Sequence, residues 1–367
     1  MSQQRLRIGV IGGGLVAQVE HIPNLKLRRE HFDLRCVSDP SATVRAALAE
    51  RFDVATFADA GEVIAQPLDA VLIAAPDPWH AELCVATIEA GLHVFCEKPI
   101  CYGPAELDRI RAARDRASVV VQVGYMKRFD PSYRAAIELV QGRAGALRYV
   151  SVDVHDPDAW PFVAHHRVVA ASDVAEELRA ATRDRQRAQV IAALGFEPDA
   201  TLFRGFTGAY CSSLVHDVNA VHGLLDAIGI SVGDVAGAAV FADGKGGQGT
   251  VRLGGGQALW TMAHVETPDL ASYRERISLY FENEVVELVF PSPYLNHQPT
   301  RLLHSASREH CLETREIRAG FAEPFQVELE AFRDTIQAGA APVNTLEEAG
   351  RDQALLIALG RAARAVA

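Results

Sequence analysis

The chain has 367 residues, of which 49% are hydrophobic and 23% charged, so it can bury the cores of two ordinary domains and is not disordered. Its formal net charge of −11 argues against a nucleic-acid surface and against an anionic membrane surface, because both need a basic footprint. No apolar stretch approaches the roughly 20 residues of a membrane span, and six scattered cysteines without a C-x-x-C pair favour reduced thiols in a cytoplasm.

Short apolar runs alternate with helical patterns from residue 1 to about residue 124. Continuous apolar strands that alternate with helices predict a parallel sheet covered on both faces. A glycine at position 91 lies where a helix C-terminal glycine belongs. The expected strands are Leu6–Ile11, Leu34–Ser38, Ala70–Ala75, His93–Cys96 and Val119–Val123, and the expected helices are Ser41–Phe52 and Trp79–Ala90.

The pattern changes after about residue 124. From Val235 to Phe290 apolar and polar residues alternate, which predicts a mostly antiparallel sheet with one exposed face. Turns are expected at Asp243–Gly249 and at Asn283. The other expected elements are a strand at Arg148–His155, a helix between a Ser172 cap and Gly195, and helices at Asp217–Ile228, Pro324–Ala338 and Leu346–Val366.

Residues 12–17 form the G-x-G-x-x-A version of the dinucleotide fingerprint, between a predicted strand and a predicted helix. Gly12 permits a tight turn, Gly14 lets the backbone approach a pyrophosphate, and Ala17 allows close packing of helix on strand. The pyrophosphate would bind the N–H groups at the helix N-terminus. The expected cofactor-binding residues of this loop are Gly12, Gly14, Leu15, Val16 and Ala17.

Asp39 follows the second strand, about 22 residues after Ala17. An acid at this place accepts hydrogen bonds from the ribose hydroxyls and repels a 2′-phosphate. The sequence therefore predicts NAD as the cofactor. NADP is the less favoured alternative, because neighbours such as Ser38 can soften the choice.

Lys98 lies in the sequence Glu97-Lys98-Pro99, directly after a predicted strand. The carboxyl ends of strands in an open parallel sheet face the ligand crevice, so Lys98 is expected to point toward the nicotinamide. A lysine there could polarise a reacting hydroxyl or carbonyl. The alternative is an ordinary surface lysine.

Several motifs, in this order along the chain, resemble the Gfo/Idh/MocA family of sugar and cyclitol dehydrogenases. The resemblance covers nearly the whole chain except residues 157–208. It implies an N-terminal Rossmann domain over 1–124 and a C-terminal α/β domain with an open, mainly antiparallel sheet over 125–367. The motifs are the fingerprint, Ala75-Pro76-Asp77 with His80, Glu97-Lys98-Pro99, the residues 123–130, the residues 212–217 and the loop Pro342-Val343-Asn344-Thr345.

The resemblance also implies roles for individual residues. Lys98 would be the catalytic lysine, and His216 would match the histidine that exchanges the proton of the reacting hydroxyl. Ala75, Pro76, His80 and Glu97 would belong to the cofactor site. The residues expected near the substrate are Tyr125, Met126, Lys127, His155, Ser212 and Asp217.

Position 212 departs from the family pattern. Inositol dehydrogenases carry an aspartate four residues before the histidine, and this chain has Ser212 there. A serine can hydrogen-bond an imidazole but cannot stabilise imidazolium as a carboxylate does. The proton relay is incomplete unless another acid, such as Asp156 or Asp217, takes this part.

These features favour an NAD-dependent dehydrogenase that acts on a secondary hydroxyl or ketone of a sugar or cyclitol, without a metal. Two alternatives stay open: an enzyme that cleaves glycosides by transient oxidation with tightly held NAD, and a non-catalytic nucleotide-binding regulator. His165 and His166 with His155 and Asp156 could suggest a metal site, but their spacing favours exposed loop residues. Residues 157–208 are expected to border the substrate pocket rather than the adenine end, and the chain to form a homodimer or homotetramer.

Overall fold

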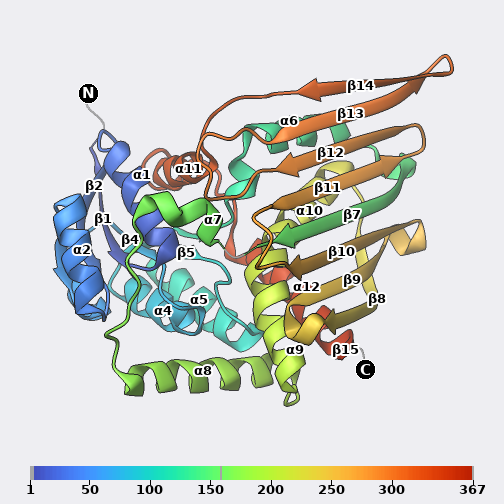
Figure 1. The fold of residues 1–367 in the computed structure, drawn as a ribbon. Helices are drawn as coiled ribbons and strands as arrows, with labels where there is room; N and C mark the ends of the chain where they lie inside the picture. The colour runs from blue at the N-terminus through green and yellow to red at the C-terminus, as the bar shows by residue number, and fades with distance from the viewer. Residues whose placement is uncertain (1–3, 158, 366–367) are drawn as a thin grey trace. The chain divides into compact units, whose positions relative to one another are not determined.

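The computed structural model describes residues 4–157 and 159–365, which divide into two compact units (Figure 1). The first unit contains the described residues up to Tyr125 together with Val163–Ala193 and Phe325–Gly350. The second contains Met126–Phe162, Leu194–Pro324 and the described residues from Arg351 onward. The expected domain boundary at residue 124 lies next to Tyr125, where the first segment of the first unit ends. Two later segments, which the sequence analysis placed in the second domain, belong to the first unit.

The first unit is built on a six-stranded parallel sheet with the order β3-β2-β1-β4-β5-β6, which confirms the predicted Rossmann-type sheet. Only β3 escaped prediction, because three residues carry too short a pattern. The strands are β1 (Leu6–Ile11), β2 (Phe32–Ser38), β3 (Ala55–Phe57), β4 (Ala70–Ile73), β5 (His93–Glu97) and β6 (Val121–Gly124). The helices are α1 (Ile22–Leu27), α2 (Ala42–Phe52), α3 (Ala60–Ile64), α4 (His80–Glu89), α5 (Pro104–Ala117), α8 (Glu176–Leu194) and most of α11 (Pro324–Ala338).

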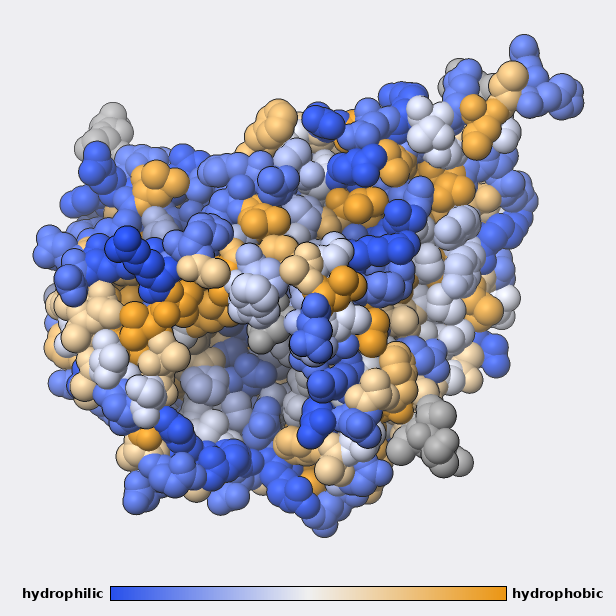
Figure 2. Space-filling view, viewed as in Figure 1, coloured by the Kyte–Doolittle hydropathy of each residue, from blue (hydrophilic) through white to orange (hydrophobic). Residues whose placement is uncertain are grey.

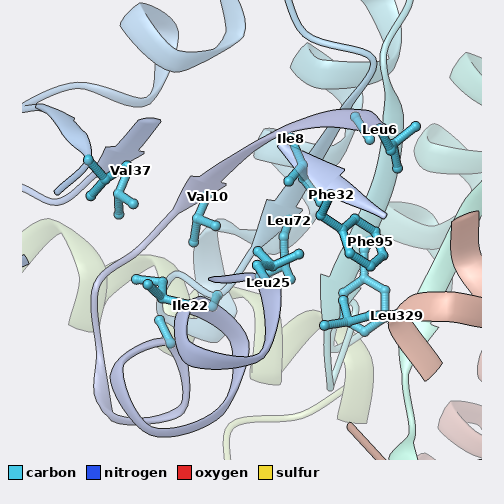
Figure 3. Packing of buried hydrophobic residues seen from close by; sticks show 14 of the residues in the cluster. Leu6, Ile8, Val10, Ile22, Leu25, Phe32, Val37, Leu72, Phe95 and Leu329 are labelled. Atoms are coloured by element: carbon cyan, nitrogen blue, oxygen red, sulfur yellow. The ribbon is translucent and has the colours of Figure 1, made fainter. Parts of the chain in front are cut away.

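Alternate residues of β1 anchor the core of this unit (Figure 3). Leu6, Ile8 and Val10 are at most 2% exposed and meet Leu72 of β4 and Phe95 of β5. Burial of such side chains contributes about 1.5–3 kcal/mol each. The central strands are therefore fixed, and with them the loops at their carboxyl ends.

Strand order in the first sheet reverses at β1, because β2 lies on one side of it and β4 on the other. In open α/β sheets a ligand crevice forms outside the carboxyl ends of the strands at such a switch point. The fingerprint loop follows β1, Asp39 follows β2, and Ala75 follows β4. All three expected cofactor segments therefore lie at this edge of one sheet.

The second unit contains a nine-stranded sheet with the order β14-β13-β12-β11-β7-β10-β9-β8-β15 (Figure 1). Only two neighbouring pairs, β7 with β10 and β8 with β15, are parallel, which confirms the mainly antiparallel sheet. The strands are β7 (Leu147–Asp156), β8 (Val232–Phe241), β9 (Gly246–Leu253), β10 (Ala258–Glu266), β11 (Arg274–Phe281), β12 (Glu284–Phe290), β13 (Arg301–Arg308), β14 (Cys311–Ile317) and β15 (Ala363–Ala365). The helices are α6 (Pro131–Val140), α7 (Trp160–Val163), α9 (Ala200–Gly205), α10 (Val215–Ile228) and α12 (Leu346–Ala362), and a π-helix spans Phe206–Leu214.

Two sequence-based boundaries in the second unit are wrong. The last helix ends at Ala362, and Ala363–Ala365 pair with β8 instead, while Val366 lies outside the described residues. The glycine-rich segment expected as a turn over Asp243–Gly249 turns only to Lys245 and then enters β9. A Cβ at Gly246 would lie 2.2 Å from the Phe241 ring, so this strand carries glycine because neighbouring side chains cover it.

Helices α6 and α10 pack on one face of the nine-stranded sheet, and Figure 1 shows the opposite face without a helix across β7, β10 and β11. Figure 2 shows hydrophobic side chains scattered among hydrophilic ones over these strands. In the part of the chain that the structure describes, no helix is both long enough and apolar enough to cross a membrane.

Candidate active site

The fingerprint loop has the backbone shape that a pyrophosphate site needs. Gly12 adopts a φ of +97°, and a Cβ there would lie 2.3 Å from the carbonyl oxygen of Ala74. Gly14 is exposed, and a Cβ there would meet no atom within 4 Å, so the approach to its backbone is open. The first helical hydrogen bond runs from Gln18 N–H to Gly14 O at 3.0 Å. The N–H groups of the preceding turn, Leu15 to Ala17, can therefore bind an anion.

The fingerprint helix widens to a π-helix over Ala17–His21 before it continues as α1. Pro23 lies just after this segment and cannot donate a backbone hydrogen bond, and its ring would clash with the carbonyl of Val19 in a regular α-helix. The wider turn accommodates the proline. It also fixes the directions of Gln18 and His21, which make the contacts described below.

Asp39 is 8% exposed, and both of its carboxylate oxygens are held by backbone N–H groups. Oδ2 accepts from Gly13 N at 2.9 Å, and Oδ1 accepts from Ser41 N at 2.8 Å. Each oxygen keeps a further lone pair with which it can accept a hydroxyl donor. The carboxylate is thus preorganised beside the glycine loop, as a ribose diol requires.

His80 joins two loops at the carboxyl edge of the sheet. Its Nδ1 lies 2.8 Å from the carbonyl oxygen of Pro99, and its Nε2 lies 2.7 Å from that of Ala75. The side chain is 1% exposed. His80 therefore ties the Ala75–Pro76 turn to the turn that carries Lys98.

Glu97 ends β5 with its carboxylate directed into the first unit. Oε1 lies 2.6 Å from His21 Nε2, and Oε2 accepts from the backbone N–H of Lys98 at 3.2 Å. Burial raises the pKa of the Glu97 carboxyl, but the hydrogen bond and charge of His21 and the charge of Lys98 outweigh burial, so the pKa is lowered. Glu97 thereby locks the turn on which the half-buried Lys98 is presented.

In the first unit, the loop that carries Asn344 is hydrogen-bonded to the end of β6 and to Tyr125 directly after it. The Asn344 side chain donates to the carbonyl oxygen of Tyr125 at 3.0 Å, and the Asn344 carbonyl accepts from Val123 N–H at 2.9 Å. Asn344 is fully buried and adopts a φ of +60°. The loop between α11 and α12 therefore shapes the strand end just before the second unit begins.

Lys127 is the cation of a buried network in the second unit. Its Nζ donates to Asp217 Oδ1 at 3.1 Å and also contacts Glu275 Oε1, while the hydroxyl of Tyr273 donates to Glu275 Oε2 at 2.8 Å. All four residues belong to the second unit: Lys127 lies on the turn after Tyr125, Asp217 on α10, Glu275 on β11 and Tyr273 just before β11. Lys127 and Asp217, which were expected to contact substrate, are 4% and 1% exposed and bind each other in this network, so their contact with substrate stays a prediction.

The charges of this network are unequal, because one ammonium faces two carboxyl groups. Burial lowers the pKa of Lys127, but Asp217 and Glu275 outweigh it, so the pKa is raised and the ammonium stays charged. Burial and the neighbouring Glu275 raise the pKa of Asp217 well above its ordinary value, against the opposing effect of Lys127. The Asp217 carboxyl therefore keeps its proton to a higher pH than an ordinary aspartic acid does.

His216 is the second residue of α10 and is half-buried, whereas Ser212 lies four residues earlier on the π-helix and is exposed. Of the two acids considered as substitutes for the family's aspartate, Asp217 belongs to the Lys127 network, and Asp156 Oδ2 lies 3.9 Å from His264 Nε2. His155 lies at the end of β7, where its Nε2 is 3.1 Å from Asp153 Oδ1. Met126 begins the turn that carries Lys127.

The segment 157–208 is divided between the two units. Val163–Ala193 fold with the first unit, where Val169 contacts Gln18 of the fingerprint helix and Asp173 contacts Ser41 next to Asp39. The described residues of the segment outside Val163–Ala193 belong to the second unit, and their place beside a substrate stays a prediction. Local pattern could not reveal the contacts in the first unit, because Ser41 lies 132 residues from Asp173 and Gln18 lies 151 residues from Val169.

Sequence reasoning missed Gln18, Asn344 and Glu275. Glu275 could have been found from the sequence. It alternates with Ile277 and Leu279 on the buried face of β11, so it is a charged residue at a core position. Gln18 and Asn344 act through long-range backbone contacts, which no local pattern shows.

No group of three or more His, Cys, Asp or Glu side chains within residues 4–157 and 159–365 is arranged to hold a metal ion. The rings of His165 and His166 lie against each other with centroids 4.0 Å apart. His155 belongs to the other unit.

Residues 6–125 match the model of the Gfo/Idh/MocA family, described as an oxidoreductase family with an NAD-binding Rossmann fold. Among curated relatives, inositol 2-dehydrogenase 3 of Saccharopolyspora erythraea is 36% identical over 172 residues, which cover 46% of this chain and 50% of that protein. Myo-inositol 2-dehydrogenase of Thermotoga maritima is 34% identical over 158 residues, which cover 41% of this chain and 47% of that protein. The chain thus matches about half the length of these relatives.

Solved structures match over nearly the whole chain. A putative NADPH-dependent oxidoreductase from Desulfitobacterium hafniense superposes with a TM-score of 0.76 at 16% identity, covering 98% of this chain and 96% of that chain. A 3-ketoreductase from Actinomadura kijaniata, solved with NADP, superposes with a TM-score of 0.73 at 17% identity and 99% coverage of both chains. At these identities the similarity shows that both units share the fold of these proteins.

Proposed function

We propose, from the membership of residues 6–125 in the Gfo/Idh/MocA oxidoreductase family, that this protein is an NAD(H)-dependent oxidoreductase acting on a secondary hydroxyl or ketone of a sugar or cyclitol. The observation that carries the proposal is the Asp39 carboxylate, held by Gly13 N–H and Ser41 N–H beside an open glycine loop. The inositol dehydrogenases among the relatives and the 3-ketoreductase among the solved structures support a polyhydroxylated substrate.

The residues of the first unit fit a dinucleotide. The open backbone at Gly14 and the helix N-terminus after it would bind the pyrophosphate, and Asp39 would accept from the ribose hydroxyls. When bound, the nicotinamide ring supplies the hydride chemistry. The full negative charge on Asp39 opposes a 2′-phosphate, which favours NAD although some solved structures of this fold hold NADP.

Lys98 and His216 would manage the single proton of the reaction. Lys98 stands on a turn locked by Glu97 and His80, and in the proposal its ammonium donates a hydrogen bond to the reacting oxygen. His216 belongs to the second unit and would take or return the hydroxyl proton, while the Lys127 network supports the helix that bears it. Ser212 stands where inositol dehydrogenases carry an aspartate, and a serine can hydrogen-bond an imidazole but cannot stabilise imidazolium as a carboxylate does.

The test is the appearance of the NADH absorbance band when NAD and a panel of inositols, hexoses and sugar acids are added to the protein. Lys98→Ala serves as the control and is expected to lose about 10²–10⁴-fold in rate while it still binds NADH. Turnover in the wild type supports a dehydrogenase. Release of an aglycone from a glycoside panel without NADH formation would instead indicate a glycoside-cleaving enzyme. If the protein shows neither activity, a nucleotide-binding regulator is the remaining alternative.

We further propose that two copies associate through the helix-free face of the nine-stranded sheet, as a homodimer or within a homotetramer. Tyr149 pairs in register with Leu259 and Tyr280, so the three side chains share one face, where Leu259 is 40% and Tyr280 38% exposed. Leu259→Lys is expected to shift the mass in sedimentation toward the monomer.

The free cysteines, five of them buried and Cys311 exposed, fit the cytoplasm that we propose as the compartment of this protein.

A further inference from the structure

Residues 166–173, which we call the strap, run from the end of a 3₁₀-helix at His166 into a coil that leads to α8 (Figure 1), and hydrogen bonds tie them to other parts of the first unit at three points. Arg51 on α2 donates to the carbonyl of His166 at 2.8 Å. The Gln18 amide makes two bonds with the backbone of Val169, of 2.8 and 2.9 Å, as a neighbouring strand would. Asp173 then reaches the N-terminus of α2. The strap therefore runs past the fingerprint helix and ends beside the loop that carries Asp39.

Ser41 hydrogen-bonds two carboxylates, one through its backbone N–H and the other through its side-chain hydroxyl. Its N–H donates to Asp39 Oδ1 at 2.8 Å, and its hydroxyl donates to Asp173 Oδ1. Asp173 Oδ2 accepts from the backbone N–H of Thr43 at 3.1 Å, in the first turn of α2. The two acids thus approach the same residue, one from the end of β2 and one from the strap.

These donors are the groups that would otherwise receive a 2′-phosphate. A helix N-terminus that follows the second strand of a dinucleotide fold attracts anions through its free N–H groups. Asp173 uses one of them and the Ser41 hydroxyl, and the hydrogen bonds from Ser41 and Thr43 lower the pKa of Asp173 to about 2. The nearest cation of this loop, Arg45, binds the carbonyl oxygens of Asp39 and Pro40 at 2.7 and 3.0 Å.

We propose that Asp173 is a second specificity-determining residue, which rejects the 2′-phosphate of NADP by occupying the donors of the α2 N-terminus and by adding a negative charge beside Asp39. The inference rests on the proposed dinucleotide function and extends it to a segment that matches no familiar pattern. In this arrangement Asp39 selects for the ribose diol, while Asp173 selects against the phosphate. The strap places this second acid at the crevice from 130 residues further along the chain.

The experiment is a fluorescence titration of NADH and of NADPH against the full-length protein, because binding needs no substrate. Asp173→Asn removes the charge and keeps an oxygen acceptor for Thr43 N–H. Asp184→Asn is the matched control, since Asp184 is an exposed acid on α8 of the same segment. Thermal unfolding of both variants verifies that the strap still folds.

Removal of one charge that faces a phosphate of charge about −1.5 to −2 is expected to strengthen NADPH binding by roughly fivefold to thirtyfold. NADH binding should change by less than about twofold, and the gain for NADPH should shrink at high salt. Asp184→Asn should leave both affinities unchanged.

Equal NADPH affinities in Asp173→Asn and Asp184→Asn would overturn the proposal. A parallel loss of NADH and NADPH binding would also overturn it, because it would make the strap a purely structural support. A wild type that prefers NADPH would refute the assigned NAD preference, whereas a further gain for NADPH in Asp173→Asn would still support Asp173. A wild type that binds neither nucleotide would refute the proposed function itself and this inference with it.

Discussion

The carboxylate of Asp39 accepts a hydrogen bond from the backbone N–H of Gly13 at 2.9 Å, so the acid after β2 is tied directly to the glycine loop after β1. Any change at Asp39 therefore alters both the ribose acceptor and the loop that faces the pyrophosphate. This coupling makes Asp39 the most informative single position of the dinucleotide site.

Asp39→Asn is expected to weaken NADH binding by about tenfold to a hundredfold, since one charge-assisted acceptor of a ribose hydroxyl is lost. NADPH binding should weaken less or improve, because the repulsion of the 2′-phosphate is removed. Titration of both nucleotides measures the ratio. A wild type that binds NADPH more tightly than NADH would show that Asp39 does not set the preference.

The proton relay can be tested at Ser212. Ser212→Asp would restore the acid that inositol dehydrogenases place four residues before the histidine, and it should stabilise the imidazolium form of His216. The pKa of His216 should rise, and the acid limb of the pH–rate profile should move to higher pH. His216→Ala should lower kcat by about 10²–10⁴-fold with NADH affinity preserved. An unmoved profile in Ser212→Asp together with near-full turnover in His216→Ala would exclude His216 as the proton-transfer group.

Lys127→Met should destabilise the protein by about 3–5 kcal/mol, because it leaves Asp217 and Glu275 buried without their cation. The double variant Lys127→Met/Glu275→Gln should recover part of this loss, since it removes one of the two acids. Chemical denaturation measures both free energies of unfolding. If Lys127→Met costs less than 1 kcal/mol, the network does not hold the second unit in the way described.

The raised pKa of Asp217 predicts a pH dependence of stability. Between the ordinary carboxyl pKa and the raised one, the folded state binds more protons than the unfolded state, so stability falls as pH rises through the folded pKa. Asp217→Asn keeps the shape of the protonated acid and should remove this slope. Denaturation of the wild type and of Asp217→Asn over a pH series gives the difference, and identical slopes would refute the assignment of the proton.

Local pattern predicted the parts of the fold whose partners are close in the chain. The run Leu6–Ile11 and the glycines after it produced a strand and a turn at the expected residues. The helix expected over Ser41–Phe52 begins at Ala42, and Ser41 caps it by accepting from Val44 N–H. The strap could not be predicted in this way. Its contacts, such as Gln18 with Val169, depend on backbone groups 151 residues away, and no side-chain periodicity encodes them.

The residues of the candidate site likewise divide into those with a local sequence signal and those without one. Residue type and position after a strand were sufficient to propose Asp39 and Lys98 as site residues, because the chemistry of an acid or a lysine at a strand end is local. The local sequence around Lys127 could not predict its buried network, because its partner Glu275 lies 148 residues further along the chain. Long-range charge partners therefore surround Lys127 with a buried network that its local sequence does not indicate.

We propose that Lys98 and His216 act on one hydroxyl of a substrate that lies beside a bound dinucleotide. A crystal structure of the protein with NADH and an unreactive cyclitol or sugar ligand would test this proposal. We expect Lys98 Nζ and a ring nitrogen of His216 both to lie within about 3.2 Å of the same ligand oxygen, or to be joined to it through one water. If either group points away from that oxygen, or the dinucleotide binds elsewhere than at the fingerprint loop and Asp39, the proposed mechanism is contradicted.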